Sequence, residues 1–124
     1  MDISLFRYIL PLELLESFHI IDVSEYYDIS TQLTSLYISL EEQNIIPNGY
    51  DQSQYESKGF YPEKQIQDFP IRGKSVYLVI KRRRWRHKVH KNEIIQNDYS
   101  FIAEGSKLTK ELSDFLKGTG RYPS

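Results

Sequence analysis

The chain of 124 residues contains no cysteine and no long hydrophobic run. Without cysteine there can be neither a disulfide framework nor a thiolate zinc site, which fits a reducing, cytoplasmic compartment. Asp2, Arg7 and Glu13 interrupt the partly apolar N-terminus, and no stretch approaches 18 unbroken apolar residues. The sequence therefore predicts neither a signal peptide nor a membrane span.

The length corresponds to one domain, since about 150 residues are typical of a single folding unit. Hydrophobic residues make up 40% and charged residues 27% of the chain, a balance typical of a globular protein. We expect one domain over residues 1–118, followed by a short polar tail over residues 119–124.

The net charge of −1 conceals a strong asymmetry between the two halves of the chain. Residues 1–70 carry three basic residues against twelve acidic ones, a net charge of −9, whereas residues 71–124 carry thirteen against five, a net charge of +8. The segment 72–91 holds nine Lys or Arg residues, two histidines and no acid. Such asymmetry indicates a face that binds a polyanion.

Hydrophobic periodicity predicts an α+β fold: a small twisted antiparallel sheet of four to five strands with short N-terminal and C-terminal helices. The expected helices cover residues 11–17 and 106–117, the second with Ser106 as its N-cap. The expected strands cover residues 19–23, 34–40, 64–69, 75–85 and 99–103, with loops at 24–32 and 43–63. The long 43–63 loop is unusual for so small a domain and indicates either a function or a decayed element.

The strand predicted at 75–85 changes from apolar to basic at Lys81. Alternation places Lys81, Arg83 and Trp85 on one face, and the remaining arginines on the other. Cations buried without partners are costly, so this strand end is expected to reach solvent or a partner. Same-face neighbours about 6.6 Å apart suit a row of phosphate contacts, and an indole ring suits base stacking.

The alternative is that this basic run is an ordinary part of the fold. The twelve acidic residues upstream are able to pair with the basic residues within the fold. Trp85 is able to pack at the edge of the core. Both interpretations stay open at the level of sequence.

The segment from Gln67 to Trp85 resembles a motif in the N-terminal region of bacterial insertion-sequence transposases whose gene is split into two reading frames. The matching residues are Asp68, Pro70, Gly73, Val76, Leu78, Ile80, Arg83, Arg84 and Trp85. The similarity extends over most of residues 9–117. It implies a zinc-ribbon-like hairpin joined to a catalytic core with Asp/Asp/Glu metal ligands.

Two departures from that family qualify what the resemblance implies. A zinc ribbon needs four Cys or His ligands, and the corresponding regions near 45–60 and 86–95 contain no cysteine, so we expect no zinc and no other cofactor. Only 39 residues follow Trp85, too few for the catalytic core. Catalysis would belong to a partner subunit encoded by the second reading frame.

The histidines form neither a convincing metal site nor a known catalytic pattern. His87 and His90, with His19 far upstream, make a poor metal shell because no carboxylate accompanies them. The pair also resembles the His-hydrophobe-His strand of small single-domain transposases and relaxases that use a tyrosine nucleophile. The spacing is one residue too long, however, and Tyr122 has no helix to present it.

The resulting functional hypothesis is a non-enzymatic, DNA-binding domain or accessory protein of a transposase. It would bind double-stranded DNA at the ends of the element and work beside the catalytic subunit. The candidate DNA-binding residues are Arg72, Lys74, Lys81, Arg82, Arg83, Arg84, Trp85, Arg86, Lys88 and Lys91. The alternative hypothesis is a protein-interaction module that docks onto the catalytic subunit without binding DNA itself.

Overall fold

The computed structural model describes residues 3–105 and 108–118. The chain forms two sheets and a few short helices, which confirms the α+β class. In chain order the helical elements are η1 (Ile3–Tyr8), α1 (Leu12–Ser17), η2 (Gln52–Gln54), α2 (Ser100–Gly105) and α3 (Lys110–Lys117). The strands are β1 (Phe18–Asp28), β2 (Leu33–Glu42), β3 (Tyr55–Phe60), β4 (Lys64–Ile71), β5 (Lys74–Lys81), β6 (Arg83–His87) and β7 (Ile94–Ile95).

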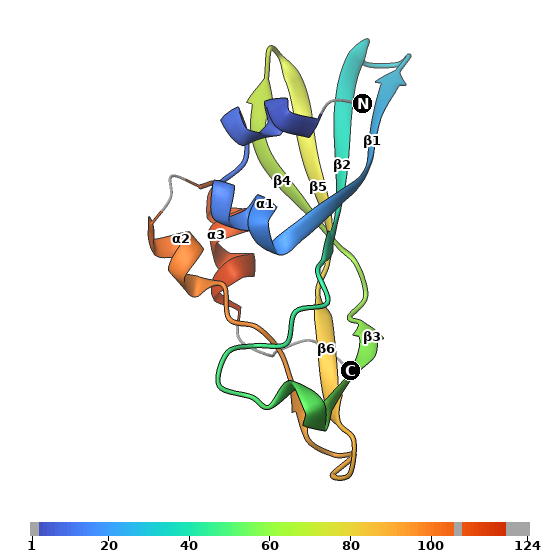
Figure 1. Cartoon of the computed structure of the whole chain (residues 1–124). Helices are drawn as coiled ribbons and strands as arrows, with labels where there is room; N and C mark the ends of the chain where they lie inside the picture. Colours follow the sequence, from blue (N-terminus) through green and yellow to red (C-terminus); the bar gives the residue numbers. More distant parts are fainter. Residues whose placement is uncertain (1–2, 106–107, 119–124) are drawn as a thin grey trace.

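The larger sheet has the strand order β1-β2-β5-β4, and η1, α1, α2 and α3 lie on one side of it (Figure 1). The β1–β2 and β4–β5 pairs are antiparallel, but the central pair β2–β5 is parallel. An entirely antiparallel sheet was expected. The difference arises because the chain forms β3 in another sheet and then β4 before β5 enters beside β2, in the same direction.

Alternating apolar residues of the central strands form the main core beneath the helices. Ile38 and Leu40 of β2 and Leu78 of β5 are fully buried and pack with Leu14 of α1 and Leu112 of α3. Each such side chain contributes roughly 1.5–3 kcal/mol through burial. The period-2 patterns read from the sequence therefore correspond to real strand faces.

The smaller sheet has the order β3-β6-β7 and continues the molecule away from the helices (Figure 1). One long strand was predicted over residues 75–85, but the chain breaks at Arg82, between β5 and β6. The main-chain oxygen of Arg82 accepts a 2.8 Å hydrogen bond from the Tyr61 N–H. The break transfers the chain from one sheet to the other.

Three further predictions about local structure are wrong. The expected loop at 24–32 is strand as far as Asp28, and the expected 43–63 loop contains η2 and β3. Residues 99–103 were predicted as a strand but enter helix α2. The Asp98 carboxylate accepts from the Ser100 N–H at 2.9 Å, and Tyr99 and Ile102, three residues apart, are both buried, which suits a helical turn.

The terminal helices follow the sequence pattern closely. Helix α1 confirms the prediction for 11–17. Helix α3 begins later than expected, because the Thr109 side chain accepts from the Leu112 N–H and acts as the N-cap. The proposed cap Ser106 and the proposed tail 119–124 lie outside the described residues.

The turn between β4 and β5 forms where the sequence places Arg72-Gly73. Both residues have positive φ angles, 49° and 79°, and Ile71 pairs with Lys74 across the turn. Two consecutive left-handed residues are typical of the tight type I′ hairpin, in which glycine carries no steric cost.

Candidate nucleic-acid interface

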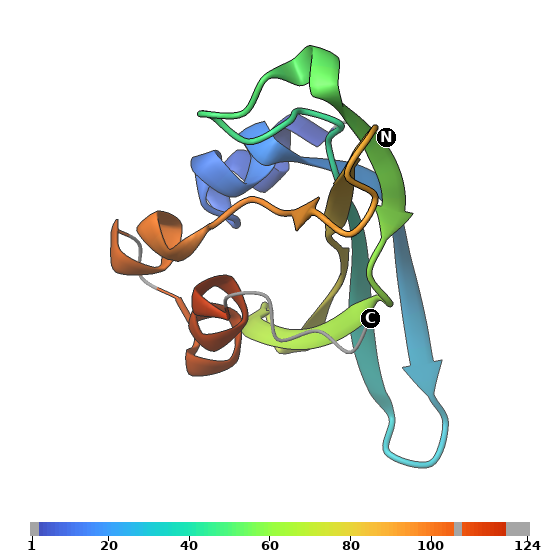
Figure 2. The same cartoon turned by 90° about the horizontal axis from the view of Figure 1, so that it is seen from below.

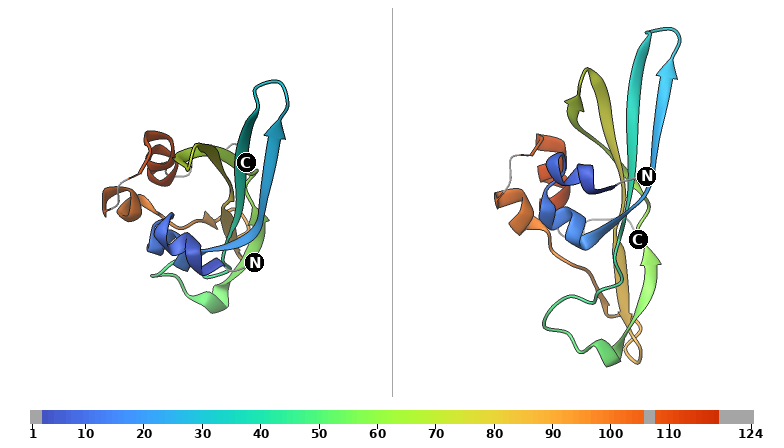
Figure 3. Two further views of the ribbon diagram at one scale, coloured as in Figure 1. Left: turned by 90° about the horizontal axis from the view of Figure 1, so that it is seen from above. Right: turned by 45° about the horizontal axis from the view of Figure 1, so that its top comes forward.

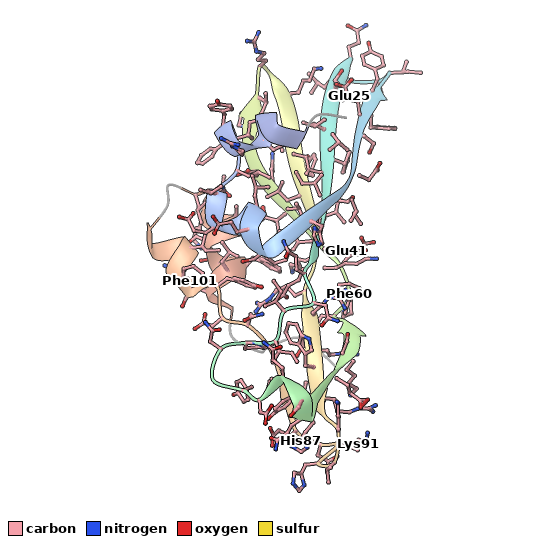
Figure 4. The ribbon with its side chains drawn as sticks, viewed as in Figure 1. Glu25, Glu41, Phe60, His87, Lys91 and Phe101 are labelled. Atoms are coloured by element: carbon pink, nitrogen blue, oxygen red, sulfur yellow. The ribbon has the colours of Figure 1, made fainter. Side chains whose placement is uncertain are left out.

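The structure distributes the ten candidate DNA-binding residues over the length of the molecule. Arg72 and Lys74 lie at the β4–β5 turn, whereas Lys91 follows β6 and lies near His87 at the opposite end (Figure 4). Between them, the junction of the two sheets holds Lys81, Arg82 and Arg83, and β6 carries Arg84, Trp85 and Arg86. They do not form a single row.

Glu42 organises the junction between the two sheets. It is only 1% exposed, and its carboxylate accepts from the Arg83 N–H at 2.8 Å, from the Asn97 amide at 2.9 Å and from the Tyr99 hydroxyl. Arg83 also donates through Nε to the Glu42 main-chain oxygen at 2.8 Å. A buried carboxylate is tolerated only when it is satisfied in this way.

Burial and the neighbouring Glu42 carboxylate raise the pKa of the Tyr99 hydroxyl well above its ordinary value. Tyr99 therefore stays protonated and remains a hydrogen-bond donor to Glu42 at any pH at which the protein is folded. The three donors to the Glu42 carboxylate, which are the Arg83 N–H, the Asn97 amide and the Tyr99 hydroxyl, therefore keep their protons near neutral pH.

Arg82 is buried inside the fold, with 2% of its surface exposed. Its guanidinium donates to the main-chain oxygens of Asn97 and Gly118, the second at 3.3 Å, and lies 5.1 Å from the centre of the Tyr99 ring. Arg82 cannot reach a phosphate in this arrangement. Its prediction as a DNA contact is wrong. The strand pattern assumed that a charged side chain here must reach solvent, whereas main-chain carbonyl groups distant in sequence satisfy the buried guanidinium.

Trp85 is also buried, with no exposed surface, and forms the small core of the second sheet with Tyr55 and Ile95. Its indole N–H donates to the Asn44 side-chain oxygen at 2.8 Å. An indole that is packed and hydrogen-bonded on the inner face cannot stack on a base. The prediction that Trp85 stacks on a base is therefore wrong, and the alternative, that Trp85 packs within the fold, is confirmed.

Three other candidates are engaged within the fold but remain partly exposed. Lys74 pairs with Glu25 at 3.0 Å, and Lys81 lies 3.9 Å from Glu41. The Arg83 guanidinium donates to Ser57 at 3.1 Å and lies 4.4 Å from the centre of the Phe60 ring. Partners from the acidic half of the chain thus reduce the positive potential that the sequence indicated.

The outer side of the β3–β6 ribbon keeps an excess of positive charge. Trp85 and Tyr55 point inward, so alternation turns Arg84 and Arg86 of β6, and Glu56 and Lys58 of β3, outward. We call this surface, with the loop that follows β6, the basic ribbon face; its cations are Lys58, Arg84, Arg86, Lys88 and Lys91. Its carboxylates are Glu56 and, close to Lys88, Asp51, whose pKa the Lys88 charge helps to lower.

A single carboxylate serves two of these cations. Arg86 donates to Glu56 at 2.9 Å, and the Lys91 ammonium lies 3.6 Å from the other oxygen. The hydrogen bond from Arg86 and the charge of Lys91 hold the pKa of Glu56 below its ordinary value. Glu56 therefore stays ionised and positions both cations while neutralising only one charge.

Arg84 is the least satisfied cation of the basic ribbon face. Its guanidinium lies 5.1 Å from the centre of the Tyr61 ring, and within the described residues it makes no hydrogen bond or ion pair. Lys58 and Lys88 are exposed and likewise have no ion-pair partner in that part of the chain. These three side chains are free to contact an anion.

Lys58 was not among the predicted site residues. Sequence reasoning missed it because residues 43–63 were expected to be irregular, so no strand face was assigned to it. The alternation of Tyr55, Ser57 and Gly59 with Glu56 and Lys58 is the signal that a strand prediction would have used.

The histidines next to this face have a structural role. His87 Nδ1 accepts from the main-chain N–H groups of Val89 and His90 at 3.1 and 3.0 Å and so closes the turn after β6. In the described portion of the chain, no group of three or more His, Asp or Glu side chains is arranged to hold a metal ion.

A cleft with a volume of about 460 Å³ lies elsewhere, between the 45–50 loop and the 96–101 segment. Its lining includes the acids Glu16 and Asp98 and, among the residues described, no Lys or Arg. The cleft therefore does not extend the basic ribbon face.

No protein-family model matches this chain, and neither a curated protein nor a solved structure shows significant similarity to it. No helix within residues 3–105 and 108–118 is long and apolar enough to cross a membrane. The geometry defines a small α+β protein with a basic face on its smaller, three-stranded sheet.

Proposed function

We propose that this chain is a non-catalytic DNA-binding domain that acts with a separate catalytic transposase subunit in the bacterial cytoplasm. The observation that carries the proposal is the basic ribbon face, where five cations outnumber the carboxylates Glu56 and Asp51 on the outer side of β3 and β6 and the loop that follows. The Gln67–Trp85 motif supplies the link to split transposases.

The shape of this face suits duplex DNA. Arginine binds either phosphate oxygens or a guanine edge, so cations on the outer side of β6 are able to contact the DNA backbone. Arg84 and Arg86 lie two residues apart on the same strand face, about 6.6 Å along the strand. This spacing matches successive phosphates along one DNA strand well enough for both to be contacted.

The experiment is a salt titration of binding to duplex DNA that carries an element's terminal repeat. Five phosphate contacts predict that log K falls with log salt with a slope of about −4.5. Replacing Lys58, Arg84 and Lys88 by glutamine leaves two contacts and a slope of about −1.8. Glutamine retains most of each side-chain stem, so the packing of Arg84 on Tyr61 is largely kept.

The matched control replaces Lys64, Lys110 and Lys117 by glutamine, which removes the same charge from exposed positions outside the ribbon. This variant should keep most of the wild-type slope. A wild-type slope near zero, or an equal loss in both variants, would refute DNA binding through the basic ribbon face.

The second candidate is a protein-interaction module that docks onto the catalytic subunit. The observation that favours it is a set of exposed apolar side chains on the β1–β2 hairpin, far from the basic ribbon face. In that case, the ribbon variant would leave duplex binding by the assembled complex unchanged. A metal-dependent DNA-cleavage assay with the chain alone should be blank under either proposal.

A further inference from the structure

The distal part of the β1–β2 hairpin, residues 21–36, extends away from the helices and from the rest of the sheet; we call it the arm. Views along the sheet show its end projecting beyond the neighbouring elements (Figures 2 and 3). Within the arm, Val23 and Leu36 pack against the main core, whereas the end of the hairpin, from Tyr26 to Leu33, has no register partner in β5 among the described residues.

The arm nevertheless carries large apolar side chains. Ile29 at the turn is 83% exposed, and four others are at least half exposed: Ile21, Tyr26, Tyr27 and Leu33. Scattered exposed apolar residues are normal, but a group of five within thirteen residues is typical of a contact surface.

Strand β1 forms the open edge of the larger sheet. In the part of the chain that the structure describes, β1 pairs with β2 alone, so its other edge has no strand partner. Phe18 at its start is buried, and the residues of the arm, from Ile21 to Asp28, are exposed or half-buried. Proteins usually protect such an edge with lysine or proline. Residues 18–28 contain neither, and only the irregularity between Ile20 and Asp22 interrupts the edge.

The charge of this edge is negative. Asp22, Glu25 and Asp28 are the charged residues of β1, and Lys74 pairs with Glu25 alone. Hydrogen bonds from Ser30 hold the pKa of Asp28 below its ordinary value, so it stays ionised. Glu25 lies on the arm, at the end of the molecule opposite to Lys91 (Figure 4).

We propose that the β1 edge of the arm receives an extended segment of another protein in which lysine or arginine alternates with apolar residues. The segment adds a strand to the sheet: its backbone pairs with β1, its cations face Asp22 and Asp28, which share one face of the strand, and its apolar residues lie on the opposite face beside Tyr27. Alternation along a strand lets one segment meet both requirements at once.

Two other occupants fit less well. A second copy pairing through its own β1 would bring like-charged acids together across the strands, with His19 as the only basic side chain of the strand to offset them. Nucleic acid would meet carboxylates instead of cations. A cationic, partly apolar protein segment is the occupant whose charge complements this edge.

The test uses the whole chain and a short capped peptide in which lysine and valine alternate. Calorimetry gives the affinity, and NMR amide shifts should move along residues 18–28. A peptide of the same composition with its lysines and valines in two blocks, and a fully N-methylated version without N–H donors, should each bind at least about tenfold more weakly.

The acids are tested by the double variant Asp22→Asn and Asp28→Asn, which keeps side-chain size and the Asp28 turn hydrogen bonds. It should weaken peptide binding about three- to tenfold. The matched control, Glu13→Gln with Glu63→Gln, changes two exposed acids outside the arm and should have less than a twofold effect.

Equal binding of the N-methylated peptide, no shifts along β1, or equal effects of the two acid variants would overturn the proposal. A dimer of the chain alone that the arm variant Ile29→Ser dissociates would also overturn it, because it would assign the edge to a second copy. Different variants test the arm and the basic ribbon face, so the failure of one proposal is distinguishable from the failure of the other.

Discussion

Replacing the buried Glu42 by alanine should destabilise the protein more than removing an exposed carboxylate of its acidic half. The carboxylate is buried and accepts three hydrogen bonds, from the Arg83 N–H, the Asn97 amide and the Tyr99 hydroxyl. Without it, these three donors lose their buried acceptor. Breaking a buried, hydrogen-bonded charge network by removing one partner costs about 3–5 kcal/mol.

For a domain of this size, that loss corresponds to a fall in Tm of about 10–25 °C. Urea denaturation followed by circular dichroism should give the same difference in free energy of unfolding with an unchanged slope. Since the loss is a large part of the stability of a typical domain, Glu42→Gln serves as a second variant. It keeps one acceptor oxygen and should lose roughly half as much.

The neighbouring Glu41→Ala is the matched control. Glu41 is partly exposed, lies 3.9 Å from Lys81, and should cost less than about 1 kcal/mol. If Glu42→Ala cost no more than Glu41→Ala, the buried network would not hold the two sheets together. The assignment of Arg82 and Arg83 to internal contacts would then be unsupported.

Two further predictions concern stability. Burial raises the pKa of Asp68, so its carboxyl group binds a proton more tightly in the folded state than in the unfolded state. The stability that protonation contributes is fully present below the ordinary pKa of 3.8 and is lost as pH rises through the raised pKa. Asp68→Asn should therefore raise Tm at about pH 7 and have little effect near pH 3, and a lower Tm at neutral pH would contradict this. Gly73→Ala forces a side chain into a φ of 79° and should cost about 1 kcal/mol in urea denaturation, with Gly73→Asn costing less. Equal stability of all three proteins would show that the turn relaxes.

Local patterns in the sequence predicted much of the fold. The alternation of Ile38 and Leu40, and of Val76, Leu78 and Ile80, identified strand faces that are buried in the structure. The helix at 12–17 and the turn at Arg72-Gly73 also follow from nearby residues alone. These features depend on interactions within a few positions of the chain.

The candidate site was predicted less well, because its outcome depends on residues far apart in sequence. The alternation from Lys81 to Arg86 indicated one exposed strand with six basic or aromatic side chains. The partners that change this lie about forty positions away in sequence for Arg83 and Trp85, at Glu42 and Asn44. A period-2 pattern contains no information about which distant acid or amide will face it.

The sequence by itself determined the α+β class and the separation of acidic and basic residues into two halves of the chain, because composition, periodicity and turn residues are local properties. The tertiary structure decided which charges remain available. It buried Arg82 and Trp85, paired Lys74 and Lys81, and left Arg84 and Lys88 on a ribbon whose outer side keeps excess positive charge. The physical reason is that a cation's partner is set by the folded positions of distant chain segments.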